Sequence, residues 1–264
     1  MPESSALPGD PAVSETHFFD SFDGTRLAYY TQGEGRPVVL LHGLFSSAQM
    51  NWIKWGHAAR LAASGFGAVM LDFRVHGQSA APHDPSAYPA GALVRDVAAL
   101  VDHLGLEPGG FDLVGFSLGA RTAVHAVAYG VLEPRRLALC GMGLAGLGGW
   151  ARRADHFKRV IDEFDTIKPG DPAFTARTFL KSQGIDRIAA RLLLEAMEDF
   201  DLARLAAVTM PCALICGDDD MDNGSAEELA AALPDARYIA IPGTHMNSVT
   251  KPDLGVAIAD FLAA

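Results

Sequence analysis

The sequence contains little cysteine, and this shortage excludes one class of small protein. Only 3 of the 264 residues are cysteines, which is too few for the disulfide framework of a small secreted domain. All three lie in apolar runs, where a thiol usually behaves as a small buried hydrophobe. Cys212 and Cys216 would face the same side of one strand, but no histidine or further cysteine stands beside them to complete a metal site. We therefore expect no disulfide and no bound metal at any of the three cysteines, Cys140, Cys212 and Cys216.

Positive charge is scarce as well. The chain has 21 Lys and Arg residues against 32 Asp and Glu residues, which gives a formal net charge of −11. No cluster of basic residues could neutralise a phosphate backbone, so we expect no nucleic-acid partner. An acidic balance mainly promotes solubility and self-repulsion, and it therefore says little about a substrate.

Long apolar segments are also missing. No run reaches the roughly 18 to 20 residues that span a bilayer, so no membrane span is expected. Residues 1–15 are rich in proline, serine and acidic side chains and lack the basic and apolar regions of a secretory signal. We expect a flexible tail over 1–15 and a cytoplasmic location. The sequence does not indicate an oligomeric state.

Short apolar runs alternate with amphipathic stretches along most of the chain, in which 49% of the residues are hydrophobic. The Asp23-Gly24 turn predicts an antiparallel opening. The later apolar runs have the length and composition of strands that are covered on both faces. Strands are expected at 16–19, 26–31, 37–41, 67–71, 111–114, 136–140, 212–216 and 237–241, and helices at 51–63, 90–104, 118–129, 225–233 and 252–262. This order predicts an α/β protein with a mostly parallel central sheet and helices on both faces.

Residues 141–208 interrupt the alternation with amphipathic helical patterns, at 154–164 and 187–198, and no convincing strand. We expect a small helical cap there, inserted into a core that is formed by 16–140 and 209–264. Its aromatic side chains could line a pocket or pack the inserted helices onto the core, and the packing role is favoured. These side chains are Trp150, Phe157, Phe164, Phe174, Phe179 and Phe200.

The strongest functional signal is Gly115-Phe116-Ser117-Leu118-Gly119, a G-x-S-x-G motif that follows an apolar strand and precedes a helical run. This context is the one that the motif requires. Its glycines remove side chains where the strand turns sharply into the helix. Ser117 is therefore predicted to lie on a strained turn with its Oγ projecting above the sheet, as a nucleophile.

Five segments together resemble the α/β-hydrolase superfamily, and the resemblance covers nearly the whole chain. They are the His42-Gly43 loop, Asp72 to Ser79, the G-x-S-x-G turn, Gly217 to Asp220, and Pro242 to His245. The resemblance implies an α/β-hydrolase fold. One departure is Val75, where many relatives have glycine, which leaves room for a different backbone conformation. Asp72, Arg74 and His76 are interpreted as residues that brace this loop.

A serine hydroxyl needs a neighbouring base to remove its proton. In the resembled superfamily the nucleophile, acid and base follow one another in that order. This order sets aside six histidines upstream of Ser117, namely His17, His42, His57, His76, His83 and His103. Two more are assigned to the helix after the serine (His125) and to the inserted segment (His156). His245, in a loop after the last predicted strand, is the expected general base.

The third member should be a carboxylate that orients the imidazole and stabilises the imidazolium. Four candidates follow the strand at 212–216: Asp218, Asp219, Asp220 and Asp222. The resemblance favours Asp220, while Asp219 and Asp222 stay open as alternatives. A second acid position of some relatives, after the strand that ends at Cys140, is occupied here by Gly141 and Met142.

The loop His42-Gly43-Leu44-Phe45 follows the strand at 37–41, where the fold needs backbone N–H groups that can point at a developing oxyanion. Leu44 is the expected first donor, and Leu118, directly after the nucleophile, is the second. His42 itself is interpreted as structural.

These residues predict a serine hydrolase, most simply a carboxylesterase, that acts on a small, partly apolar ester through an acyl-enzyme at Ser117 and uses no cofactor. Haloalkane dehalogenases and epoxide hydrolases, which resemble this chain, have aspartate at the turn, so those activities are not expected. The motif does not separate ester hydrolysis from acyl transfer, perhydrolysis, carbon–carbon bond hydrolysis or cyanohydrin cleavage. A non-catalytic ligand-binding protein on the same scaffold is the alternative of another class.

Overall fold

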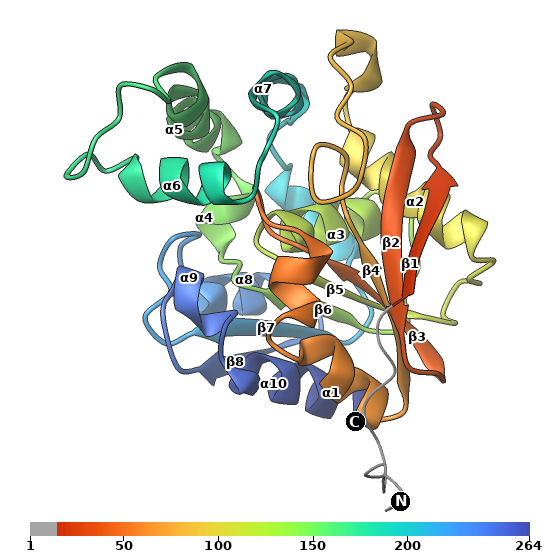
Figure 1. The fold of residues 1–264 in the computed structure, drawn as a ribbon. Helices are drawn as coiled ribbons and strands as arrows, with labels where there is room; N and C mark the ends of the chain where they lie inside the picture. Colours follow the sequence, from red (N-terminus) through yellow and green to blue (C-terminus); the bar gives the residue numbers. More distant parts are fainter. Residues whose placement is uncertain (1–14) are drawn as a thin grey trace, which may run out of the picture.

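An eight-stranded sheet forms the centre of the computed structural model, which describes residues 15–264; the other residues of the predicted tail, 1–14, lie outside the described residues. The strand order is β1-β2-β4-β3-β5-β6-β7-β8 (Figure 1). The strands are β1 (Glu15–Asp20), β2 (Arg26–Gln32), β3 (Arg36–Leu41), β4 (Phe66–Leu71), β5 (Asp112–Phe116), β6 (Leu137–Cys140), β7 (Cys212–Gly217) and β8 (Ala236–Ile241). β2 is antiparallel to both β1 and β4, and every other pair is parallel. The predicted α/β-hydrolase fold, with its antiparallel opening, is confirmed.

Helices cover both faces of the sheet, because the central strands carry apolar side chains on both sides. Every residue of β5, β6 and β7 is buried. One face packs against α1 (His57–Ala63) and α10 (Pro252–Ala263). The other packs against α2 (Ala92–His103), α3 (Leu118–Ala128) and α8 (Ala226–Ala232). A sheet that is buried on both sides reads as short continuous apolar runs, which is why the strands were predictable.

The continuous helix predicted over 51–63 is wrong. The structure has a single π-helical turn, η1 (Gln49–Ile53), followed by α1. Gly56, with φ 75°, stands between them in the left-handed region that glycine favours, and it breaks the helix. The amphipathic pattern continued across the break because Trp52 of η1 and Leu61 of α1 are both fully buried on the same side of the sheet.

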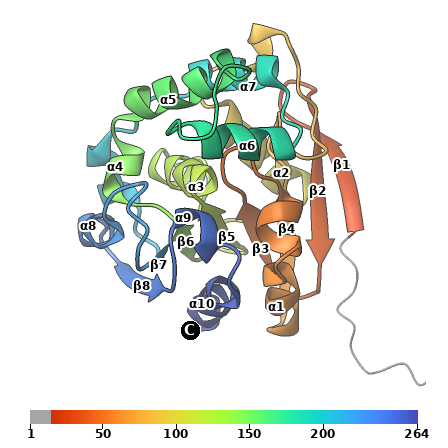
Figure 2. The same cartoon turned by 60° about the vertical axis from the view of Figure 1, so that its left-hand side comes forward.

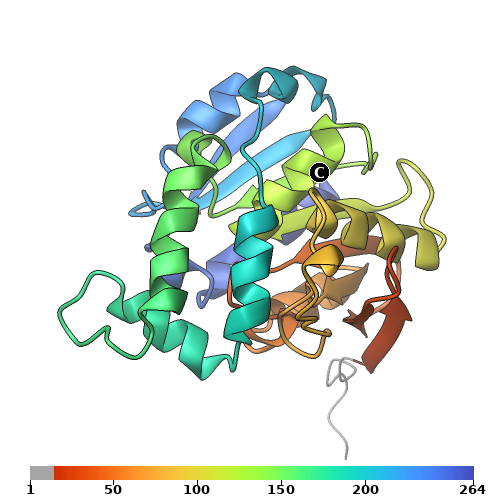
Figure 3. The same cartoon turned by 90° about the horizontal axis from the view of Figure 1, so that it is seen from above.

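Between β6 and β7 the chain forms helices and no strand, in a stretch that is described throughout. The helices are α4 (Leu144–Leu147), α5 (Trp150–Asp162), α6 (Phe174–Ser182), α7 (Arg187–Ala196) and the 3-10 helix η3 (Leu202–Ala207). α5, α6 and α7 lie along the top of the molecule, opposite α1 and α10 (Figure 2). Seen from above, α5 and α7 run side by side, with α6 across their ends (Figure 3). Within residues 15–264 the helices are all too short or too polar to cross a bilayer.

The inserted segment is tied to α3, the helix that starts next to Ser117. Arg121 of α3 is buried, and its guanidinium donates to the backbone carbonyls of Gly146, Leu147 and Glu198, so that both ends of the helical segment are held by one side chain. The aromatic residues of the segment divide between two roles. Trp150 and Phe200 are buried, Phe164 and Phe174 pack partly buried against the core, and Phe157 and Phe179 line a cavity.

Candidate active site

Ser117 occupies the sharp turn between β5 and α3. Its φ of 53° and ψ of −109° are rare for a residue with a side chain, and its N–H donates to the carbonyl of Cys140 at 2.8 Å. The two motif glycines permit the turn. A Cβ on Gly115 would lie 2.3 Å from the backbone of Gly119, and one on Gly119 would lie 2.1 Å from the carbonyl oxygen of Leu41. The turn therefore requires glycine at both places.

Ser117, His245 and Asp220 form one hydrogen-bonded row. The Ser117 Oγ lies 3.1 Å from Nε2 of His245, and Nδ1 of His245 lies 2.9 Å from Oδ2 of Asp220. An ionised carboxylate only accepts hydrogen bonds, so Nδ1 carries the proton and Nε2 is left to accept from the serine hydroxyl. The sequence predicted that His245 lies in a loop, and this prediction is wrong. It is the first residue of a short helix, α9 (His245–Ser248).

Of the four carboxylates after β7, Asp220 is the one placed against His245. It is nearly buried, at 7% exposure, and its Oδ1 accepts from the N–H of Asp222 at 3.2 Å. Asp218 is exposed and accepts from the N–H of Gly243 at 2.7 Å, which fixes the chain just before His245. Asp219 is also exposed, and Asp222 faces the cavity described below. The alternatives Asp219 and Asp222 are therefore not brought to the histidine.

In the loop after β3, the backbone N–H groups on both sides of Leu44 have acceptors. The N–H of Gly43 donates to Oδ1 of Asn51 at 3.0 Å, that of Phe45 to Nε2 of His76 at 3.0 Å, and that of Ser46 to the carbonyl of Gly43 at 3.1 Å. Among residues 15–264 the Leu44 N–H has no such acceptor. The first N–H groups of a helix have no partner inside it, and Leu118 is the first residue of α3.

Two buried histidines hold this loop in place. His42 accepts from the N–H of Phe73 at 3.1 Å through Nε2, and its Nδ1 donates to the carbonyl of Gly43 at 2.8 Å. His76 donates from Nδ1 to the carbonyl of Arg74 at 2.9 Å and accepts from Phe45. Burial lowers the pKa of His42 to about 4 and that of His76 to about 3, so both rings are neutral near pH 7. The bond from His76 to Arg74 agrees with the bracing role that the sequence interpretation gave His76, but its contact to Phe45 and the contact of Asn51 to Gly43 were not predicted.

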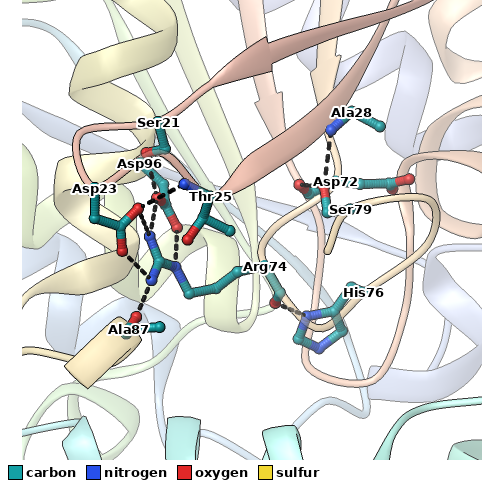
Figure 4. A network of polar contacts seen from close by, with 10 residues as sticks. All are labelled: Ser21, Asp23, Thr25, Ala28, Asp72, Arg74, His76, Ser79, Ala87 and Asp96. Atoms are coloured by element: carbon teal, nitrogen blue, oxygen red, sulfur yellow. Dashed lines mark hydrogen bonds and ion pairs between the residues drawn. The ribbon is translucent and has the colours of Figure 1, made fainter. Parts of the chain in front are cut away.

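Asp72 and Arg74 brace the loop over 72–79, in agreement with the interpretation from the sequence. Asp72 accepts from the N–H groups of Ala48 and Gln78 at 2.7 and 2.9 Å. The fully buried Arg74 forms two bonds with Asp96, at 2.6 and 2.7 Å, and a third with Asp23 at 3.0 Å (Figure 4).

Val75 adopts a backbone conformation that glycine favours. Its φ is 78°, and its side chain is buried. For a β-branched residue this conformation is strained.

A cavity of about 720 Å³ opens beside Ser117 and His245. This volume lies in the range of small-molecule sites. Its wall is largely apolar, with Phe45, Phe116, Phe157, Phe179, Met50 and Met246 among the lining residues, and it also carries Lys54, Arg152 and Arg153. Helices α5 and α6 supply one side of it. Among the described residues no group of three or more His, Cys, Asp or Glu side chains is arranged to hold a metal ion.

Comparison with known proteins shows the family of this chain. The model of the alpha/beta hydrolase family matches residues 38–257. The chain is 33% identical over 174 residues to the N-formylmaleamate deformylase of Pseudomonas putida, across 65% of this chain and 61% of that protein. It is 36% identical over 125 residues to epoxide hydrolase 4 of Mus musculus, across 46% of this chain and 33% of that one. The matched parts thus span from about a third to three fifths of these relatives.

Solved structures share the fold over nearly the full length. A hydrolase from Pseudomonas aeruginosa PA01 superimposes with a TM-score of 0.73 at 24% identity, covering 95% of this chain and 99% of that one. An enol-lactonase from Burkholderia xenovorans LB400 gives 0.71 at 23%, covering 94% and 100%. An esterase from Exiguobacterium antarcticum gives 0.75 at 20%, covering 94% and 99%. At these identities the likeness concerns the fold alone.

Proposed function

From the premise that the chain belongs to the alpha/beta hydrolase family, we propose that it is a serine hydrolase that cleaves a small, partly apolar ester-like substrate through an acyl-enzyme at Ser117. One observation carries the proposal: the Ser117 hydroxyl and the Asp220 carboxylate each stand in hydrogen-bond distance of the His245 imidazole, and Ser117 and His245 line the cavity.

In the first half of the reaction, Ser117 Oγ attacks the carbonyl carbon while Nε2 of His245 takes the hydroxyl proton. The imidazolium that forms is stabilised by Asp220, which also holds the ring in the required tautomer. The tetrahedral oxyanion accepts from the N–H groups of Leu44 and Leu118, and this role is supported because neither group has an acceptor within residues 15–264. Collapse of the tetrahedral species breaks the bond to the leaving alcohol, which receives the proton from His245.

In the second half, a water molecule attacks the acyl group on Ser117, and His245 takes the proton of this water. The same two N–H groups stabilise the second oxyanion. The acid leaves, and the proton returns from Nε2 to the serine oxygen. The segment 141–208 acts as a cap over these steps, since α5 and α6 contribute Phe157 and Phe179 to the wall of the cavity.

The relatives include epoxide hydrolases, but the residue at the turn favours acyl chemistry here. Attack of a serine hydroxyl on an epoxide would leave an ether on Ser117, and an ether has no carbonyl that two backbone N–H groups could polarise for release by water. An ester of Ser117, in contrast, is released by this geometry. The deformylase relative removes a formyl group from nitrogen by its name, so an acyl group on nitrogen is compatible with the same steps.

Turnover of p-nitrophenyl esters of increasing acyl length tests the proposal and maps the cavity. We expect hydrolysis by the wild-type chain and its loss in Ser117→Ala and in His245→Ala, with both variants still folded by circular dichroism. Full turnover in Ser117→Ala would contradict the mechanism, because no acyl-enzyme could then form at the turn.

A further inference from the structure

The cavity beside Ser117 has an excess of positive charge. Its lining includes the three cationic side chains Lys54, Arg152 and Arg153 and the single carboxylate Asp222. The chain as a whole carries a formal net charge of −11, so the cavity wall has the opposite sign to the protein around it. A cleft of one sign with low-dielectric walls concentrates ligands of the other sign.

Arg153 is the member of this group that is partly buried and still has free donors. Its Nη1 donates to the backbone carbonyl of Asp222, and in residues 15–264 its guanidinium enters no ion pair. Arg159, on the same helix, contacts both Glu163 and Asp171. A guanidinium has five N–H donors, so the edge formed by Nε and Nη2 of Arg153 stays available. Burial lowers the pKa of Arg153, and the charges of Asp222 and Asp220 oppose this shift.

The position of Arg153 is set by contacts to the proposed catalytic loops. The carbonyl that anchors it belongs to Asp222, two residues beyond Asp220. Four residues further along α5, the Phe157 ring packs edge-on against Phe45 of the loop that carries Leu44, with 5.7 Å between the ring centroids. Arg153 lines the same cavity as Ser117.

We propose that Arg153, with Arg152 and Lys54 in the lining of the same cavity, binds an ionised carboxyl group that the substrate carries apart from its scissile bond. The substrates are then ester-like compounds with a second, anionic end. This inference rests on the proposed serine hydrolase function. The Nε and Nη2 donors match the two oxygens of a carboxylate in parallel, which lysine cannot do.

Two pairs of esters that differ only in charge test this inference. The first pair is 4-nitrophenyl hydrogen glutarate and its methyl ester, with the charge on the acyl side. The second is 4-acetoxybenzoate and its methyl ester, with the charge on the alcohol side. We expect the wild-type kcat/KM for the charged ester to exceed that for the neutral one by about tenfold or more in at least one pair. A ratio near one, or below one, in both pairs would overturn the inference.

Substitutions then assign the preference to Arg153. In Arg153→Met the ratio of the two kcat/KM values should fall to about one, and in Arg153→Lys it should lie between. The ratio is the useful quantity, because a change near Asp220 affects both esters of a pair alike. Lys158→Met removes the same charge from α5 outside the cavity lining and should keep the wild-type ratio. Equal ratios in Arg153→Met and in Lys158→Met would overturn the assignment.

A binding measurement separates this inference from the proposed function. If none of the esters is turned over, the serine hydrolase proposal fails, and calorimetric titration with glutarate still decides the anion site. We expect glutarate to bind the wild-type chain, neutral glutaramide to bind much less, and glutarate binding to be lost in Arg153→Met. No binding of glutarate to the wild-type chain, or equal binding to Arg153→Met, would refute the site.

Discussion

The backbone N–H of Phe45 donates to Nε2 of His76 at 3.0 Å, and this bond decides which donor of the loop stays free. Together with the bond from Gly43 to Asn51, it occupies the N–H groups on both sides of Leu44. Among residues 15–264 the Leu44 N–H has no acceptor, so of these three neighbours it is the donor that is free for the proposed oxyanion.

Removing the Leu44 N–H should slow the chemical step. Leu44→Pro deletes the donor, and loss of one oxyanion contact costs about 2.7 to 4 kcal/mol of barrier, or about 10² to 10³ in kcat. Leu44→Ala keeps the N–H and should retain most of kcat. Steady-state kinetics on one p-nitrophenyl ester compares the two variants. Equal losses in both would show that the side chain of Leu44 matters rather than its N–H.

Asp220→Asn should abolish most activity and leave the fold intact. The amide can donate to Nδ1 of His245, so that Nε2 carries the proton and can no longer accept from Ser117. A fall of about 10⁴ in kcat, with little change in KM, is expected. Asp219→Asn, at the exposed residue directly before Asp220, is the matched control and should behave as wild type. Similar rates for the two variants would contradict the assignment of Asp220.

Gly119→Ala should destabilise the protein, because its Cβ would lie 2.1 Å from the Leu41 carbonyl oxygen. Inserted atoms in a tight core cost about 1 to 3 kcal/mol, occasionally more. Gly148→Ala is the control: its Cβ would meet Leu202 at 3.7 Å, an ordinary contact, and its φ is −85°. Urea unfolding measures both. A free energy of unfolding that is no lower in Gly119→Ala than in Gly148→Ala would contradict the close approach of α3 to β3.

The buried histidines should make the protein less stable in acid. The pKa of His76 is about 3 in the folded protein, against 6.5 for an exposed histidine. Below pH 6.5 the unfolded chain therefore binds a proton at this histidine, while the folded chain does not. The free energy of unfolding falls by about 1.4 kcal/mol per pH unit until the pH reaches the pKa of His76 in the folded protein. His42, with a pKa of about 4, acts in the same direction.

Burial raises the pKa of Asp72, and this shift opposes the loss of stability in acid that the buried histidines cause. A comparison of wild type with a His76 variant therefore isolates the contribution of His76. In His76→Gln the side-chain oxygen can still accept from Phe45, but the titrating group is gone. The loss of unfolding free energy between pH 7 and pH 5 should be smaller than in wild type by about 2 kcal/mol. Urea unfolding at the two pH values measures it, and an unchanged pH dependence would argue against a buried neutral His76.

The sequence predicted the elements of the sheet and the two residues with the most distinctive surroundings. Ser117 is bracketed by glycines that the turn requires, and His245 follows the last strand, so chain order and turn chemistry were sufficient to select two side chains that the structure brings within 3.1 Å of each other. The prediction of a helix over 51–63 was wrong because the apolar periodicity continues on both sides of Gly56 and does not show that the helix is interrupted there.

Other features depend on contacts between segments far apart in the chain. Four carboxylates follow β7 within five positions, and only the backbone conformation decides that Asp220 turns toward His245. The place of Arg153 in the cavity lining could not be predicted from the sequence either, because it depends on where α5 lies in the folded protein. Phe45 and His76 are 31 residues apart, and nothing in their local pattern indicates the bond between them.

Labelling with a fluorophosphonate probe tests the central claim most directly, since the reagent reacts with a serine hydroxyl only when a base and an oxyanion site activate it. Mass spectrometry of the digested protein should find one adduct, on the peptide that contains Ser117, and the adduct should be absent in Ser117→Ala and strongly slowed in His245→Ala. An unlabelled wild-type chain, or an adduct at another residue, would contradict the account.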